Sequence, residues 1–167
     1  ENQKDQALTI SVIRDDIVAQ KACFDGFTSE SICQLLLSDL VGCNITPHIT
    51  MAFRAMQCRD TGYLLQECVS GTLFEVIEST PDMTTVHICA LYVQMLFVMH
   101  VLQVTCGFKH HDLHTENVFL KSIDEDMTFN GAPLHTATHF SYKIDEDHTL
   151  YIPNMGYIVK IGDFGMA

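Results

Sequence analysis

The sequence predicts an α+β protein in which short strands come first and a long helix follows. Two β-rich runs, residues 48–58 and 63–68, precede a 21-residue segment, residues 86–106, that contains no Asp, Glu, Lys or Arg. Apolar residues make up 47% of the 167-residue chain, so it can bury a core as one compact domain or as two small lobes. The same apolar content excludes an intrinsically disordered chain.

The first predicted element is an amphipathic helix over residues 28–41. Thr28 or Ser29 would cap its start, and Gly42 ends it. The two β-rich runs follow, joined by the polar turn at residues 59–62, and this pattern predicts a β-hairpin.

Helical segments follow the hairpin. Gly71 breaks the second run, and residues 73–78 predict a short helix. Thr84 or Thr85 would then cap a long helix that runs to about Cys106.

The long helix has the length of a membrane span, but its polar residues favour a helix buried in a protein core. The uncharged run is interrupted by His87, Gln94, His100 and Gln103, and the polar cluster at residues 109–112 follows almost at once. We therefore expect no membrane partner.

The remaining chain predicts an inserted surface hairpin and a final strand. Residues 121–153 are polar apart from two short β-prone pieces, residues 140–144 and 149–152. Residues 157–161 form the last predicted strand and lead directly into Asp163.

The excess of acidic residues limits the classes of molecule that the chain is expected to bind. It carries 21 acidic against 9 basic residues, a formal charge of −12, so nucleic acid and anionic membranes have no electrostatic reason to bind. A single pocket could still take a nucleotide, because Mg²⁺ bridges carboxylates to phosphates. We expect no nucleic-acid partner, and the sequence leaves the oligomeric state open.

The cysteine pattern predicts reduced thiols in a cytoplasmic, intracellular compartment. The seven cysteines are odd in number and form no C-x-x-C pair, which disfavours a disulfide framework or a zinc site. The first residues, Glu1 to Asp5, include neither an initiator Met nor an apolar signal stretch, so we expect that the chain begins within a longer protein.

Three polar side chains are placed to converge on one point. Asp112 and Asn117 lie five residues apart on a segment that leaves the long helix and enters the β-prone run at residues 118–120. Asp163 follows the last predicted strand at a tight turn. Two carboxylates and an amide supply what phosphoryl transfer from ATP needs, namely oxygen ligands for Mg²⁺ and a carboxylate that accepts the proton of the attacking hydroxyl.

The residues His110-His111-Asp112-Leu113-His114-Thr115-Glu116-Asn117 and Asp163-Phe164-Gly165 resemble the H-x-D-L-x-x-x-N and D-F-G motifs of the protein-kinase-like superfamily, serine/threonine type. The resemblance implies a partial two-lobed kinase fold. Residues 1–66 would belong to the N-lobe, 67–71 to the hinge and 72–167 to the C-lobe, with an insert at 121–156. It also implies ATP and Mg²⁺ as cofactors, a protein substrate, and an incomplete catalytic domain that is inactive alone.

The resemblance assigns roles to single residues. Asp112 would be the catalytic base, Asn117 and Asp163 the metal ligands, and His114 a phosphate contact. Gln66 would be the gatekeeper and Phe119 the floor beneath the base. Adenine would pair with the backbone of the hinge residues Glu67, Cys68 and Val69.

The sequence leaves the identity of the phosphate-binding lysine open. Val18-Ala19-Gln20-Lys21 resembles the V-A-x-K strand, and Glu30 lies where the regulatory helix carries the partner glutamate. Only eight residues separate Lys21 from Glu30, which is short for the family, so Lys4 or a residue upstream would also fit. Glu30 could equally be an ordinary acidic residue in the first turn of the helix, where the helix dipole favours a negative charge. No G-x-G-x-x-G precedes Lys21.

Departures from the motifs indicate a divergent member. His111 replaces the arginine that would dock a phosphorylated activation loop, and His114 replaces a lysine. The 45 residues between Asn117 and Asp163, with the runs 140–144 and 151–161, resemble haspin-like kinases and kinases of large DNA viruses. For a viral protein the compartment would be the host cell.

Three other interpretations remain. The cluster His110, His111, Asp112 and His114 could hold zinc or iron. A small-molecule phosphotransferase of the aminoglycoside or choline type shares the Asp-x-x-x-x-Asn spacing and a histidine at position 114. A pseudokinase binding module would explain the missing glycine loop.

Overall fold

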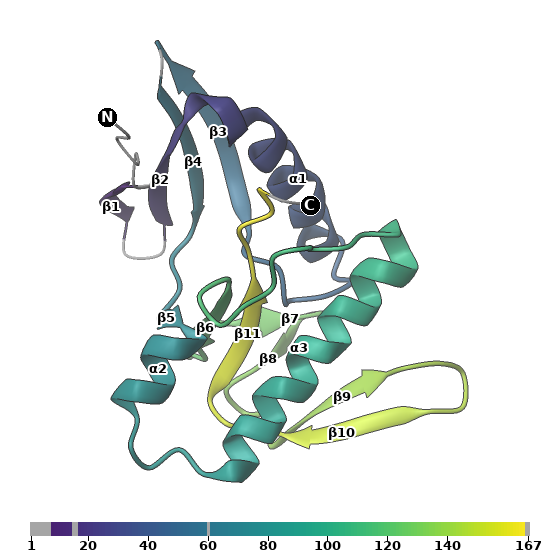
Figure 1. The fold of residues 1–167 in the computed structure, drawn as a ribbon. Coiled ribbons are helices and arrows are strands. Elements are labelled where there is room, and N and C mark those ends of the chain that lie inside the picture. Colours follow the sequence, from purple (N-terminus) through teal and green to yellow (C-terminus); the bar gives the residue numbers. More distant parts are fainter. Residues whose placement is uncertain (1–7, 15–16, 60, 166–167) are drawn as a thin grey trace.

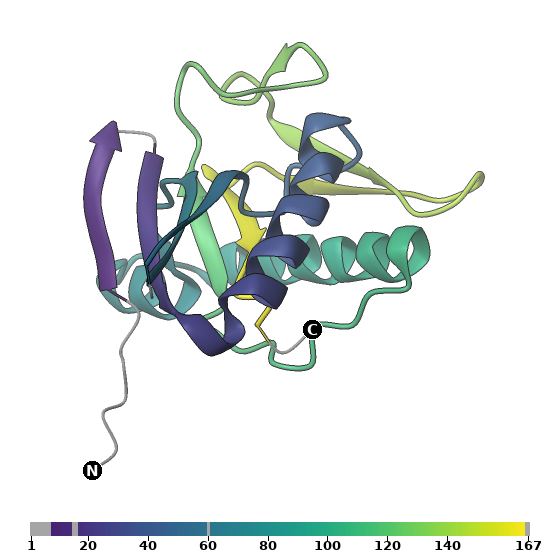
Figure 2. The same cartoon turned by 90° about the horizontal axis from the view of Figure 1, so that it is seen from above.

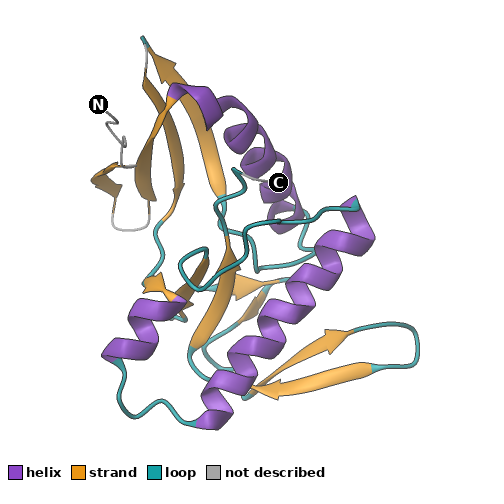
Figure 3. Ribbon diagram, viewed as in Figure 1, coloured by secondary structure: helices purple, strands orange, loops and turns teal. Residues whose placement is uncertain are grey.

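The computed structural model describes residues 8–14, 17–59 and 61–165, with side chains from residue 29 onward. Within these residues it is mixed α+β, with three helices and small antiparallel sheets, which confirms the predicted class (Figure 3). Four strands, β1 (Leu8–Arg14), β2 (Ile17–Cys23), β3 (Ala52–Cys58) and β4 (Thr61–Glu67), form one sheet in the order β1-β2-β4-β3.

Helix α1 (Phe24–Gly42) follows β2 directly and lies beside this sheet (Figures 1 and 2). The predicted start at Thr28 or Ser29 is wrong, because the helix already begins at Phe24. The pairing of β2 with β4 ends at Cys23, opposite Thr61 at the hairpin turn, so the chain leaves the sheet there and turns at once into the helix.

The predicted hairpin is confirmed as β3 and β4, although its first strand is shorter than expected. Residues 48–51 come before β3 and are not part of it. They run beside the last strand, β11 (Tyr157–Ile161), where Ile49 forms a parallel bridge with Ile161. The amide of Thr50 donates to the Ile161 carbonyl at 2.9 Å, and the Ile161 amide donates to the His48 carbonyl at 2.8 Å. The segment therefore connects the four-stranded sheet to β11.

Both predicted helices after the hairpin are confirmed. The two-residue strand β5 (Gly71–Thr72) leads into α2 (Leu73–Ser79), and α3 (Thr85–Cys106) follows. Thr72 caps α2, since its hydroxyl accepts from the Glu75 amide at 3.1 Å while the Glu75 carboxylate accepts from the Thr72 amide at 2.9 Å. Gly107, with a φ of 64°, ends α3 in the left-handed conformation that glycine adopts at least cost.

Helix α3 buries one face and exposes the other. Within the described residues it is long and apolar enough to cross a membrane by length and composition. Its inward residues Ala90, Leu91, Gln94, Val98 and Leu102 are buried against the core. Its outward face is also apolar, with Tyr92, Leu96 and Val104 exposed, so the prediction of a core helix holds for one face only.

Strand β6 (Val118–Ser122) pairs with β11 on one side and with β5 on the other. Between β6 and β11 the chain makes two hairpins. The small one joins β7 (Thr128–Phe129) to β8 (Ala132–Pro133), and the larger joins β9 (His139–Lys143) to β10 (Thr149–Pro153). The larger hairpin is the predicted one, and it projects from the body of the molecule (Figure 1).

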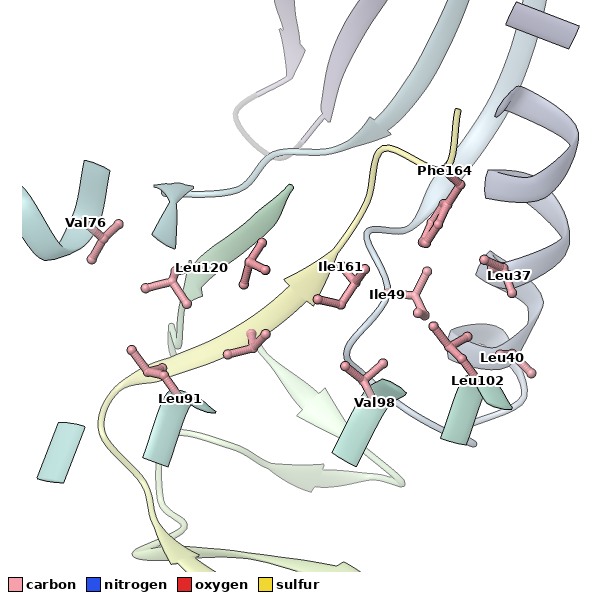
Figure 4. Close-up of a cluster of buried hydrophobic side chains, with 12 residues drawn as sticks. Leu37, Leu40, Ile49, Val76, Leu91, Val98, Leu102, Leu120, Ile161 and Phe164 are labelled. Carbon is pink, nitrogen blue, oxygen red and sulfur yellow. The ribbon is translucent and has the colours of Figure 1, made fainter. Parts of the chain in front are cut away.

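Two large buried clusters hold these parts together, and a third, small cluster is formed by Ala52 and Leu64 of the four-stranded sheet. The main core gathers residues from α1, α2, α3, β6 and β11, and Figure 4 shows Phe164 beside Ile49 and Leu37. A second core lies under the insert and contains Leu134, Phe140, Tyr142, Ile152 and Ile158. The insert is therefore more than a surface hairpin, because its inward side chains bury a core of their own.

Candidate active site

The loop between α3 and β6, residues 107–117, is fastened to the end of β11. His110 is only 2% exposed, and its Nε2 donates to the Gly162 carbonyl at 3.0 Å. Its ring also lies against Phe164, with centroids 5.3 Å apart. His110 therefore braces the loop through a backbone hydrogen bond.

Asn117 closes the other end of this loop. Its side-chain Nδ2 donates to the Asp112 carbonyl at 2.9 Å, and its amide donates to the His114 carbonyl at 3.0 Å. The Gly162 amide approaches the Asn117 carbonyl at 3.4 Å. Because Nδ2 is engaged, the amide oxygen Oδ1 is the side-chain atom that remains to ligate a cation.

Asp163 stands in a left-handed turn at the end of β11. Its φ is 57°, a conformation that Asp tolerates better than most residues. The next residue, Phe164, is 1% exposed and anchors the turn in the main core. Asp163 itself is exposed, so the buried phenylalanine holds a carboxylate at the surface.

Helix α1 places Glu30 within electrostatic range of Asp163. Partial burial raises the pKa of the Glu30 carboxyl, and the nearby charge of Asp163 raises it further. The predicted partner of Glu30 was a lysine. Lys4 lies outside the described residues, and Lys21 is described only as backbone in β2, so that pairing stays a prediction.

Asp112, His111 and His114 are exposed. His114 Nε2 lies 3.9 Å from Asp112 Oδ2, and His114 Nδ1 accepts from the Glu116 amide at 3.3 Å. His111 has a φ of 61° and is also exposed. The loop thus presents a carboxylate and two imidazoles to solvent beside the Asp163 turn.

The side of the site expected to take adenine begins where β4 ends. Gln66 is half-buried, and the Phe119 ring packs so closely on Gly162 that a Cβ there would lie 2.9 Å from Cε2. The Cys68 carbonyl accepts from Lys121 Nζ at 2.8 Å. The Glu67 amide donates to the Met51 carbonyl at 2.8 Å.

The sequence interpretation missed the role of the Glu67 side chain. Its carboxylate is 2.6 Å from Lys160 Nζ and 3.9 Å from Lys121 Nζ, and it accepts from the Met51 amide at 2.8 Å. One signal was present in the sequence. Lys160 interrupts the apolar strand Tyr157–Ile161, and a lysine inside a buried strand needs an anionic partner.

The oxygen donors at the site suit Mg²⁺ better than zinc. Among the described residues, no group of three or more His, Cys, Asp or Glu side chains gathers as a metal site. His110 faces the Gly162 carbonyl, so the histidine-rich cluster does not converge. The Asn117 amide oxygen and the Asp163 carboxylate would hold Mg²⁺, which keeps several water ligands and binds through few protein oxygens.

Comparison with known protein families and with curated proteins found no match to this chain.

Proposed function

We propose that this chain is the nucleotide- and metal-binding part of an ATP-dependent protein kinase that transfers the γ-phosphoryl group to Ser or Thr hydroxyls. The observation that carries the proposal is the fastening of the 110–117 loop to the Asp163 turn, through His110 on Gly162 and through the backbone of Asn117. These contacts bring a base candidate and two cation ligands of the kinase motifs to one edge of the molecule.

Each residue then has a chemical task. Asp112, exposed on the loop, would accept the proton of the attacking hydroxyl, and the Asn117 bond to its carbonyl holds the backbone at this position. Asn117 Oδ1 and Asp163 would hold Mg²⁺, which when bound neutralises the phosphate charge. The His114 imidazole beside Asp112 would contact a phosphate or the substrate hydroxyl.

The nucleobase would lie between Phe119 and the segment 66–69. The Cys68 carbonyl is engaged by Lys121 and the Glu67 amide by the Met51 carbonyl, so adenine would pair with the Glu67 carbonyl and the Val69 amide. Gln66, immediately before this segment, would limit the depth of the pocket. In Figure 1 the four-stranded sheet and α1 form the upper part of the molecule, and α2 and α3 lie below them beside β6 and β11. This arrangement is compatible with a two-lobed kinase fold.

Nucleotide binding by the chain is the first test. We expect wild type to bind ATP in the presence of Mg²⁺ and to lose most of that affinity without the ion. Asp163→Asn should abolish the Mg²⁺ dependence, because a carboxylate ligand is replaced by a neutral amide. Isothermal titration with and without Mg²⁺ measures both effects, and Asp124→Asn, an exposed acid in the insert, is the matched control.

Phosphoryl transfer is the second test, carried out with the reading frame extended in both directions. Labelled ATP, Mg²⁺ and a mixed protein substrate should give labelled protein, and Asp112→Asn should slow transfer by about 100-fold or more while still binding Mg·ATP. Labelling of an amino alcohol instead of protein would favour a small-molecule phosphotransferase. Absence of nucleotide binding would favour a pseudokinase module.

A further inference from the structure

Four segments of the chain meet at the Glu67 carboxylate. Glu67 ends β4, Lys160 lies in β11, Lys121 lies in β6, and Met51 belongs to the connection between α1 and β3. The shortest contact joins Glu67 Oε1 to Lys160 Nζ at 2.6 Å, and Lys160 also donates to the Ile49 carbonyl at 3.3 Å.

These charges are withdrawn from solvent. The Lys160 side chain is 5% exposed and that of Glu67 is 12% exposed. Burial lowers the pKa of Lys160, and the Glu67 carboxylate counteracts this by favouring the charged ammonium. A buried pair of this kind costs about as much to desolvate as it gains by attraction, so stability alone is a weak reason for it.

The location of the pair offers a better reason. Glu67 starts the segment expected to pair with adenine, and Lys160 precedes Asp163, the expected metal ligand, by three residues. Strand β11 is rigidly paired with β6 through the register Val159↔Leu120 and Ile161↔Val118. A bond from Glu67 to this strand therefore fixes the distance between the nucleobase side and the metal side of the site.

We propose that Glu67 and Lys160 form a positioning clamp, meaning a buried ion pair that holds segment 67–69 and Asp163 at the separation that one nucleotide spans. The inference rests on the proposed function. Lys121 assists the clamp by holding the Cys68 carbonyl at 2.8 Å. No atom of the clamp side chains needs to touch ATP.

A clamp of this type has a specific thermodynamic signature. The base and the phosphates of ATP are covalently linked, and the second half of the ligand binds with a high effective concentration only when the two half-sites have the right separation. Loss of the clamp should weaken Mg·ATP binding while leaving each half-site able to bind its own fragment.

Three probes separate these effects in NMR titrations of the chain: Mg·ATP, adenosine and Mg·tripolyphosphate. For Lys160→Met we expect about a tenfold or larger loss of Mg·ATP affinity, with the other two probes changed by less than about twofold. Lys160→Arg should restore most of the Mg·ATP affinity, because a guanidinium can bond both Glu67 and the Ile49 carbonyl. Lys143→Met removes an exposed lysine charge and should change nothing.

The outcomes are distinguishable. If wild type binds no Mg·ATP, the proposed function fails and the clamp fails with it. If wild type binds and Lys160→Met binds equally well, or loses all three probes in proportion, the clamp alone is overturned.

Should Lys160→Met fail to fold, the double variant Glu67→Gln with Lys160→Met removes both buried charges and should fold. It is expected to show the same selective loss of Mg·ATP affinity. Wild-type Mg·ATP affinity in the double variant would overturn the proposal.

Discussion

Gly162 sits where no side chain fits. A Cβ at this position would lie 2.9 Å from the Phe119 ring and 3.1 Å from Thr50 Oγ1. Gly162→Ala should therefore destabilise the protein by about 1–3 kcal/mol, since Phe119 or β11 has to shift to make room. Urea unfolding measures this loss. The matched control is Gly42→Ala, where a Cβ would meet nothing within 4 Å, and its free energy of unfolding should be unchanged or higher.

At the scale of residues, the sequence predicted the groups that belong to short motifs and missed those that depend on distant partners. Asp112, Asn117 and His110 stand close together in the chain, so their spacing alone indicated a shared loop. Glu67 meets Lys160 across 93 positions. Spacing carries no signal at that range, and only the lysine inside a buried strand hinted at a partner.

At the scale of elements, Gln94 joins α3 to β11. Its side chain is fully buried, with Nε2 donating to the Tyr157 carbonyl at 3.2 Å and Oε1 accepting from the Val159 amide at 2.9 Å. Gln94→Met preserves the shape but leaves the half-buried Tyr157 carbonyl and the buried Val159 amide without their partner, so we expect a loss of about 2–4 kcal/mol. Thermal unfolding compared with Gln103→Met, an exposed glutamine on the same helix, measures this. Equal losses in both variants would contradict the role of Gln94.

The types and order of the longer elements were predictable, whereas β1 and the β7–β8 hairpin were not predicted, and element ends depended on tertiary contacts. Both helices after the first hairpin, the β3–β4 pair and the β9–β10 pair follow from periodicity and turn residues. The start of α1 did not, because it is set by the end of the β2 ladder at Cys23. In the sequence Gln94 was only a polar interruption of an apolar run, and its two backbone partners lie more than sixty positions away.

At the scale of the whole molecule, His48 links the two cores. Its Nδ1 must donate to the Val159 carbonyl, at 2.8 Å, so Nε2 accepts from the Tyr142 hydroxyl at 3.1 Å. Burial, aided by the nearby Lys160 charge, lowers the pKa of His48 from 6.5 to about 4, against the opposing effect of the Val159 bond. The folded protein thus holds a neutral imidazole at a pH where the unfolded chain would protonate it.

This linkage predicts acid sensitivity. Because the folded pKa lies below the unfolded one, the stabilising contribution is complete above pH 6.5 and is lost as the pH falls towards 4. The loss should reach about 2 kcal/mol by pH 5. Urea unfolding of wild type and His48→Gln at pH 7.5, 6 and 5 isolates this contribution, with the exposed His100→Gln as control. Parallel curves for wild type and His48→Gln would contradict it.

The pairing of β6 with β11 separates the insert between these two strands from the candidate site, so the insert can be lengthened without moving the site residues. One end of the ladder pairs Val118 with Ile161 beside Asn117 and Asp163, while the other pairs Ser122 with Tyr157, where the insert departs and returns. The tip of the larger hairpin, residues 144–148, lies beyond both cores and is closed locally by Asp145. Doubling such a loop costs only about 0.6 kcal/mol in closure entropy. A reporter peptide or fluorescent label grafted at this tip would report on the protein without altering the spacing of the residues at the opposite end.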